Sequence, residues 1–211
     1  MWVQVKNRNN NLKFFEMKEI KEDDFKQLSN LILKENPEAL LASLSLTNIK
    51  IYLQKAIESD NLSLFVLKKK NTIVAYAIIA KKVSSLILIF SNMKLKIFFD
   101  LITTFKFIKI FNILLSYLRL DVIMLTKEKK KIINTNYNLN LLAVKRNFQS
   151  KGIGTYFLKK IFKKIKNSKY ITVESLDKKA YDFYCKKHKF LFLAEKYRII
   201  KNLKILVKKL T

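Results

Sequence analysis

The sequence predicts a protein of the α/β class, in which strands and helices alternate along one chain of 211 residues. Three observations support this class. Apolar runs rich in β-forming residues recur along the chain, and segments with the apolar spacing of helices separate them. Both glycines of the chain lie between a predicted strand and a predicted helix. No repeat and no linker rich in proline, glycine or serine divides the chain, so we expect a single domain over residues 1–211.

The first predicted elements are a strand and a group of helices. Residues 14–20 have strand character and lead into a helix over residues 21–36, whose first turn is acidic. The apolar residues of this helix recur at helical spacing: Phe25, Leu28, Leu31 and Ile32. Pro37, the only proline, interrupts the helix. Residues 37–59 then indicate one or two further helices.

A hairpin and a long apolar insertion follow. Residues 62–82 hold two runs of β-forming residues around Lys70-Asn71, which predicts a β-hairpin. Residues 84–126 are predicted to be an apolar helical insertion with a single polar stripe. The polar residues of this stripe recur every three or four positions: Lys96, Asp100, Thr103, Lys106, Lys109, Asn112, Ser116 and Arg119. The longest charge-free run is about a dozen residues, short of the ~20 that span a bilayer, so we expect no membrane span.

The last third of the chain alternates strands with helices. After a basic turn at 127–131, residues 132–144 alternate between asparagines on one face and mainly apolar residues on the other, which predicts a strand. We expect a helix from the glycines to about Lys166, a strand over 170–176 and a helix over 177–189. Residues 190–209 indicate a final hairpin.

The charge is strongly basic, with 43 Lys and Arg against 16 Asp and Glu and a net charge of +27. Residues 1–60 hold nine basic and nine acidic residues, whereas residues 61–211 hold 34 basic and seven acidic ones. Such a field favours anionic partners, which include phosphorylated cofactors, nucleic acid and anionic membrane surfaces. Because 39 of the basic residues are lysine, coding bias in an AT-rich genome is an equally open explanation.

Cysteine usage and the N-terminal sequence bear on compartment. The single cysteine, Cys185, excludes an internal disulfide and a cysteine-based metal cluster, and it fits a reducing compartment. The first residues lack the apolar segment of a signal peptide. We therefore expect a cytoplasmic protein, and we expect no metal site.

The two glycines, Gly152 and Gly154, lie in the stretch NFQSKGIGTYFLKK (residues 147–160), between a strand that ends at Val144 and a helix. A helix N-terminus offers unpaired N–H groups and partial positive charge, which together make an anion site. Glycine at alternate positions lets the backbone turn and approach a phosphate. The stretch matches neither the phosphate loop of nucleotide triphosphatases nor the dinucleotide fingerprint, because no Gly-Lys-Ser/Thr follows and a third glycine is missing.

Two stretches together resemble the GNAT acetyltransferase family. The first resembles its motif A, Gln/Arg-x-x-Gly-x-Gly/Ala after a Leu-x-Val strand, and the matching residues are Gln149, Gly152 and Gly154 after Leu142 and Val144. The second, DKKAYDFYCKKHKF, resembles the signature Asn-x-x-Ala-x-x-Phe-Tyr followed by Gly-Phe, and it matches at Asp177, Ala180, Phe183, Tyr184 and Phe190. The resemblance implies the GNAT fold, a mixed central sheet of six to seven strands flanked by helices.

The resemblance also implies acetyl-CoA as a co-substrate. Its pyrophosphate would lie on the loop formed by Gln149, Ser150, Lys151, Gly152, Ile153, Gly154 and Thr155. The backbone of Leu142 and Val144 would pair with the pantetheine arm. Tyr184 stands where the family places a tyrosine that donates to the leaving thiolate, and a phenol with a pKa of about 10 stays protonated at neutral pH. The acetyl group would pass directly to a primary amine.

Some positions depart from the family pattern. Asp177 replaces the usual Asn, and we expect it to cap the following helix. Lys189 replaces the usual Gly after that helix. No carboxylate lies on residues 132–144, a frequent location of the general base, so a water relay, Glu174 and no protein base all stay open. We interpret Cys185 as a buried thiol rather than a nucleophile, and a base role for His188 is the less favoured reading.

The acceptor is open at this stage. The insertion at 84–126 precedes the cofactor-binding strand on the side where family members shape their acceptor pocket. It is interpreted as a core-covering helix pair, an acceptor-binding wall or a lipid-facing surface that makes peripheral membrane contact. Enlarged members of this kind resemble enzymes that acetylate amino sugars in surface-polysaccharide synthesis. The alternatives are a basic GNAT acting on aminoacyl-tRNA or on a ribosomal or protein amine, and a non-catalytic CoA-binding module. Homodimerisation is open as well.

Overall fold

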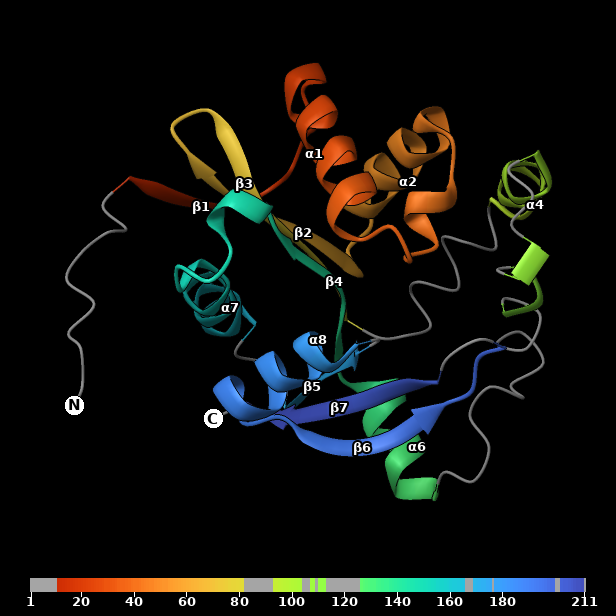
Figure 1. Ribbon diagram of the computed structural model, residues 1–211, viewed down its shortest axis with the longest axis vertical. Helices are drawn as coiled ribbons and strands as arrows, with labels where there is room; N and C mark the ends of the chain where they lie inside the picture. The colour runs from red at the N-terminus through yellow and green to blue at the C-terminus, as the bar shows by residue number, and fades with distance from the viewer. Residues whose placement is uncertain are drawn as a thin grey trace.

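The computed structural model describes residues 11–81, 93–103, 107–108, 110–112, 126–165, 169–175, 177–199 and 202–210. These residues form a seven-stranded mixed sheet in the order β1-β2-β3-β4-β5-β7-β6, with helices on both faces (Figure 1). The strands are β1 Leu12–Glu16, β2 Leu62–Lys69, β3 Thr72–Ala80, β4 Tyr137–Val144, β5 Tyr170–Ser175, β6 Leu191–Lys196 and β7 Leu203–Lys209. Among the strands that the structure describes, only β4 and β5 pair in parallel. The prediction of a mixed α/β sheet is confirmed.

The helices begin and end close to their predicted positions in most of the described chain. The α-helices are α1 Glu22–Glu35, α2 Leu46–Glu58, α4 Lys94–Thr103, α6 Lys127–Thr135, α7 Ile153–Lys164 and α8 Lys178–Asp182. Short 3₁₀ turns lie at η1 Leu41–Ser43 and η2 Arg146–Phe148, and a π-helical turn, η3 Phe183–Lys187, continues α8. The strand predicted at 14–20 lies at residues 12–16 instead, because the chain must leave the sheet edge there to reach α1.

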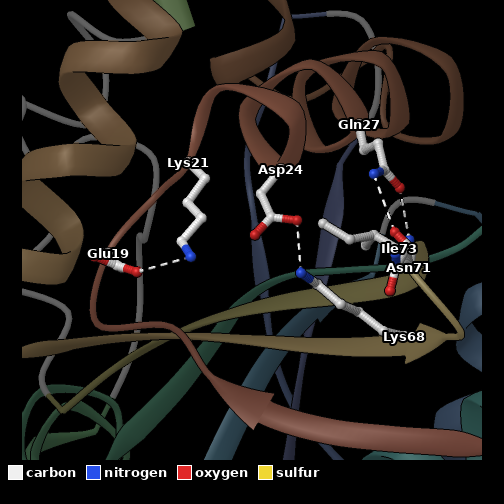
Figure 2. A network of polar contacts seen from close by, with 7 residues as sticks. All are labelled: Glu19, Lys21, Asp24, Gln27, Lys68, Asn71 and Ile73. Carbon is white, nitrogen blue, oxygen red and sulfur yellow. Dashed lines mark hydrogen bonds and ion pairs between the residues drawn. The ribbon is translucent and has the colours of Figure 1, made fainter.

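Helix α1 is fixed to the β2–β3 hairpin by polar contacts, seen from close by in Figure 2. Lys68 donates to the Asp24 carboxylate at 2.6 Å, and both side chains are largely buried. The Gln27 amide donates to the Asn71 carbonyl at 3.2 Å and accepts from the Ile73 N–H at 2.8 Å. These contacts join the helix to the turn of the hairpin and to the start of β3.

The helices bury apolar side chains on both faces of the sheet. On one face α1, α2 and α4 pack against β2, β3 and β4, and the four apolar residues predicted to recur along α1 are all buried there. On the other face α7 and the π-helical turn pack over β3, β4 and β5. Full burial of one large apolar side chain contributes about 1.5–3 kcal/mol, so these two layers supply most of the folding free energy.

The segment before β4 differs from its prediction. The sequence predicts a basic turn and then a strand over 132–144, but helix α6 occupies Lys127–Thr135 and the strand starts only after it. The Thr126 side chain accepts a hydrogen bond from the Lys129 N–H at 3.4 Å, and Glu128 lies in the first turn. A capped and charge-complemented helix start therefore outweighs the alternation of the following residues.

The strict alternation predicted along β4 is also wrong. Ile78 of β3 pairs with Leu141 and Ile79 pairs with Leu139, so Asn140 is an extra residue in β4. This β-bulge changes which face the following side chains occupy. Leu139 packs on the α7 side of the sheet, whereas Leu141 packs on the α1 side.

The predicted insertion at 84–126 is helical where it is described, at residues 94–103, 107–108 and 110–112. Four residues of the predicted polar stripe, Lys106, Lys109, Ser116 and Arg119, lie outside the described residues. In α4, Ile97 and Leu101 are buried in the core beside α2. Within the described residues, no helix combines the length and apolarity needed to cross a membrane.

Two polar residues of the stripe bond to the rest of the protein. One Asp100 carboxylate oxygen accepts from the Ser45 N–H at 2.8 Å, the Ser45 hydroxyl at 3.1 Å and the Asn48 amide at 2.7 Å. The Asn112 carbonyl accepts from Arg198 at 2.8 Å, and its side chain accepts from the Ile199 N–H at 3.0 Å. The insertion thus joins the start of α2 to the connection between β6 and β7.

Candidate active site

The central sheet opens between β4 and β5. The two strands pair only from Tyr137 with Ile171 to Leu139 with Val173, and β4 then continues to Val144 without β5 beside it. The bulge at Asn140 falls just where the pairing stops. A bulge bends its strand, so this position accounts for the divergence. Among the described residues this edge of β4 has no partner strand beyond Leu139, and such an edge can bind an extended ligand through main-chain hydrogen bonds.

The direction of the backbone groups on this edge follows from the β3–β4 register. The Lys145 N–H donates to the Val74 carbonyl at 2.9 Å, so this residue directs its backbone groups toward β3. Directions alternate along an antiparallel strand, so Leu142 and Val144 direct theirs toward the gap. The Val144 carbonyl accepts from the Gln149 side chain at 2.8 Å, in agreement with that direction. Pairing of Leu142 and Val144 with a pantetheine arm stays a prediction.

The loop after β4 holds an unusual backbone. Ser150 has φ 60° and Gly152 has φ 76°, both in the left-handed region, and Gly152 is the N-cap of α7. Glycine adopts this region without the clash that other residues incur. Gly154 differs, because a Cβ added there would meet only Phe183 at 3.4 Å and Val144 at 3.6 Å, which are ordinary contacts. The backbone conformation therefore favours glycine at position 152 but not at position 154.

The start of α7 has the chemistry of an anion site. The first intrahelical bond runs from the Tyr156 N–H to the Gly152 carbonyl, and no hydrogen bond within the described residues uses the N–H groups of residues 150–155. Unpaired amides at the positive end of a helix bind phosphate. No acidic residue lies in the first turn, and Lys145, Arg146 and Lys151 belong to the adjoining loop. These N–H groups belong to six of the seven loop residues that the sequence predicts to bind the cofactor.

The seventh predicted residue, Gln149, holds the loop in place. Its own N–H donates to the Arg146 carbonyl at 3.1 Å. Its side chain donates to Glu35 at 3.1 Å and accepts from Lys179 at 2.9 Å, in addition to its bond with Val144. The other Glu35 oxygen accepts from the Arg146 N–H at 2.9 Å. Sequence reasoning missed Glu35, because only the folded chain brings the end of α1 to this loop.

Tyr184 is buried in the π-helical turn on the α7 side of the sheet. Its ring lies edge-on to Phe183, at 5.2 Å between centroids, and to Phe190, at 5.3 Å. Burial, followed by the nearby Asp177 carboxylate, raises the pKa of its hydroxyl above the ordinary value. The phenol is therefore protonated at neutral pH and can donate a hydrogen bond. Its role as the catalytic donor stays a prediction.

His188 lies beside the first turn of α7, a contact that the sequence did not indicate. Its Nε2 is 3.3 Å from the Thr155 hydroxyl, and its ring lies edge-on to Phe183 at 4.7 Å. Burial, followed by Lys208, Lys159 and Lys187, lowers its pKa to about 4. The imidazole is thus neutral at pH 7, and it fixes the Thr155 side chain at the anion site.

The other singled-out residues have structural partners. Asp177 accepts from the Ala180 N–H at 2.6 Å, which confirms the predicted N-cap. Lys189 has φ 58°, so it holds the left-handed conformation that glycine would adopt more easily. Glu174 follows Val173, the last β5 residue paired with β4, and it accepts from Lys196 at 3.0 Å. Cys185 is a half-buried free thiol.

Two further observations concern metal binding and a pocket near the site. Within the described residues, no group of three His, Cys, Asp or Glu side chains could hold a metal ion. A pocket of about 420 Å³ lies between α1, the start of β3 and residues 145–147, and it contains Gln27, Lys34 and Glu35 among its lining residues. This pocket is beside the loop and not between β4 and β5, so it is separate from the opened strand edge.

Comparison with known proteins supports the fold. No protein-family model matches the sequence, and no curated protein matches it. Solved structures do match. One, assigned to the GNAT family of acetyltransferases and from Desulfovibrio desulfuricans, has a TM-score of 0.59 at 12% identity, with 95% of this chain and 99% of that chain covered. An acetyltransferase from Thermus thermophilus has a TM-score of 0.58 at 13% identity, covering 95% and 97%.

A third match is the ribosomal-protein-S18-alanine N-acetyltransferase of Escherichia coli, with a TM-score of 0.55 at 10% identity and with 95% of this chain and 94% of that chain covered. The protein therefore has the fold of the GNAT acetyltransferases, as the two sequence stretches predicted. At these identities the similarity shows the fold alone and does not show which reaction the protein catalyses.

Proposed function

We propose that the protein is an N-acetyltransferase that moves the acetyl group of acetyl-CoA directly to a primary amine. The observation that carries this proposal is the unpaired edge of β4 next to the amides of residues 150–155. A strand edge suits the amide-rich pantetheine arm, and a helix N-terminus suits the pyrophosphate. The two features adjoin in one site, in the order in which these groups occur in acetyl-CoA.

The chemistry requires a donor for the leaving group. As the amine nitrogen bonds to the thioester carbon, the carbon–sulfur bond breaks and the electron pair stays on sulfur. Tyr184 would donate a hydrogen bond to this thiolate. Because a phenol already has a higher pKa than an ordinary thiol and burial raises the pKa of Tyr184 further, Tyr184 would stabilise the thiolate without giving up its proton. The proton of the attacking amine leaves to solvent or to Glu174.

For the acceptor we propose a molecule that joins a primary amine to phosphate, because the net charge is +27 and the basic excess lies in residues 61–211. An amino sugar of surface-polysaccharide synthesis, linked to a nucleotide or a lipid, is our first candidate. Aminoacyl-tRNA is the alternative that the same charge favours. A ribosomal or other protein amine and a non-catalytic CoA-binding module are outcomes of the tests below.

Calorimetry with acetyl-CoA tests cofactor binding, and thiol release in the presence of amines tests acetyl transfer. We expect one binding site and a raised melting temperature with acetyl-CoA. Binding without thiol release across amino sugars, aminoacyl-tRNA and peptides would indicate a non-catalytic module. Neither heat nor thermal stabilisation would contradict the proposed cofactor. For tRNA, association that weakens steeply with salt is expected, and no association at low salt would exclude this acceptor.

A further inference from the structure

The helical insertion exposes an unusual number of large apolar side chains. Six of them are between 36% and 62% exposed, and we call them the apolar set: Phe98, Phe99, Ile102, Phe107, Ile108 and Phe111. The first three belong to α4, which lies at the edge of the molecule beyond α2 (Figure 1). Soluble proteins rarely expose apolar side chains at this density unless the surface binds something.

Contacts between the insertion and the rest of the protein fix the orientation in which the apolar set is exposed. Asp100 accepts three hydrogen bonds at the start of α2, and Ile97 and Leu101 of the same helix are buried in the core. Asn112 bonds to the connection between β6 and β7. Helix α4 is therefore apolar on two sides, one packed against the protein and one exposed.

The charged residues of the insertion indicate which kind of partner the apolar set binds. Residues 84–126 contain two acidic residues, Asp100, whose carboxylate is bonded to α2, and Asp121. The basic residues of the same range are Lys94, Lys96, Lys106, Lys109 and Arg119. Lys96 is exposed on α4 itself. An apolar surface in a segment with more cations than anions is the composition of segments that lie in the interface of an anionic bilayer.

The net charge also argues against a second copy of the chain as the occupant. Two molecules that each carry +27 repel one another, whereas an anionic lipid surface attracts each of them. The lysine side chains can extend along apolar neighbours and place their ammonium groups among the lipid phosphates.

We propose that the apolar set docks the protein on the surface of an anionic lipid bilayer. The phenylalanine and isoleucine side chains insert into the boundary between headgroups and acyl chains, and Lys96 contacts the lipid phosphates. Because α4 joins α2 and the described helical residues that follow it join the β6–β7 connection, docking fixes these two parts of the protein at the membrane. This inference is independent of the proposed acetyl transfer.

Co-flotation with vesicles tests the proposal. One set of vesicles is phosphatidylcholine alone, and the other contains about one-third phosphatidylglycerol, which supplies the anionic charge. We expect the full chain to float with the anionic vesicles at low salt, about tenfold more than with the neutral ones, and to lose most of this binding at high salt. The triple variant F98S/F99S/I102S should bind the anionic vesicles at least about tenfold more weakly.

A matched control removes exposed apolar residues elsewhere. Leu191 and Phe192 of β6 are 70% and 52% exposed, and the variant L191S/F192S should bind vesicles as the wild type does. Thermal melting verifies that each variant is folded. Absence of flotation by the wild type, or equal flotation by the triple variant, would overturn the proposal. A dimer in light scattering that only the triple variant dissociates would assign the surface to a second copy instead.

Discussion

At the residue scale, glycine occurs at the two loop positions for different physical reasons. Gly152 is required by the backbone, because its φ of 76° lies in the region that other residues enter only with strain. Gly154 has no such constraint, and the protein leaves room for a methyl group there. We therefore predict that glycine at position 154 serves a ligand that approaches the backbone, whereas glycine at position 152 serves the conformation of the loop.

Gly154→Ala tests this distinction. We expect the free energy of unfolding to rise by up to about 1 kcal/mol, because alanine favours helices more than glycine does. Acetyl-CoA affinity should fall at least about tenfold, because the methyl group occupies the approach of the pyrophosphate. Gly152→Ala is the comparison, and it should lose about 1–2 kcal/mol of stability through strain. Urea unfolding and calorimetry measure both effects. Undiminished affinity in Gly154→Ala would contradict the anion site.

Tyr184→Phe tests the donor to the thiolate. The variant keeps the ring contacts with Phe183 and Phe190 and loses only the hydroxyl. We expect turnover to fall about 100-fold and the affinity for acetyl-CoA to stay within about twofold, because the hydroxyl acts on the leaving group. Steady-state kinetics and calorimetry separate the two quantities. Tyr170→Phe, a change of the same kind at the start of β5, should leave turnover unchanged. Equal turnover in both variants would remove Tyr184 from the mechanism.

At the element scale, helix α1 connects the β2–β3 hairpin to the loop between β4 and α7. Asp24 and Gln27 bond to β2 and to the residues that follow it, and Glu35 at the other end accepts from Arg146 and Gln149. The loop is thus held by a helix from the opposite face of the sheet. Such preorganisation raises affinity because the loop loses less freedom when the ligand binds.

Glu35→Ala removes both bonds to the loop without touching the anion site. We expect the KM for acetyl-CoA to rise about fivefold, equivalent to about 1 kcal/mol, while kcat changes little. Glu35→Gln keeps an acceptor for the Arg146 N–H and should recover part of the loss. Glu38→Ala is the control, because Glu38 is exposed just beyond the helix. A fall in kcat with an unchanged KM would contradict a positioning role.

At the scale of the whole molecule, local signals predicted most of the fold. The hairpin at residues 62–80, the helix α7 and the N-cap at Asp177 appear as the sequence indicates, because each depends on neighbouring residues. The bulge at Asn140, the contact of Glu35 with the loop and the place of His188 beside Thr155 could not be predicted. Each of these depends on a partner more than 30 residues away in the chain.

The buried His188 gives the whole fold a pH dependence. Its pKa is about 4 in the folded protein against an ordinary value of 6.5, so between these values the unfolded chain binds the proton more readily. Stability should therefore rise as the pH increases from about 4 to about 6.5, and it should be lost as the pH falls through that range.

Urea unfolding at a series of pH values from 4 to 8 measures this slope. His188→Gln keeps a polar group near the Thr155 hydroxyl and cannot titrate. The stability of this variant should therefore vary less with pH than that of the wild type, and the difference in slope should be confined to the range between about 4 and about 6.5. Carboxylates titrate in both proteins and cancel in the comparison. Parallel pH profiles would show that His188 protonates as readily in the folded protein as in the unfolded chain, which would contradict its burial against the first turn of α7.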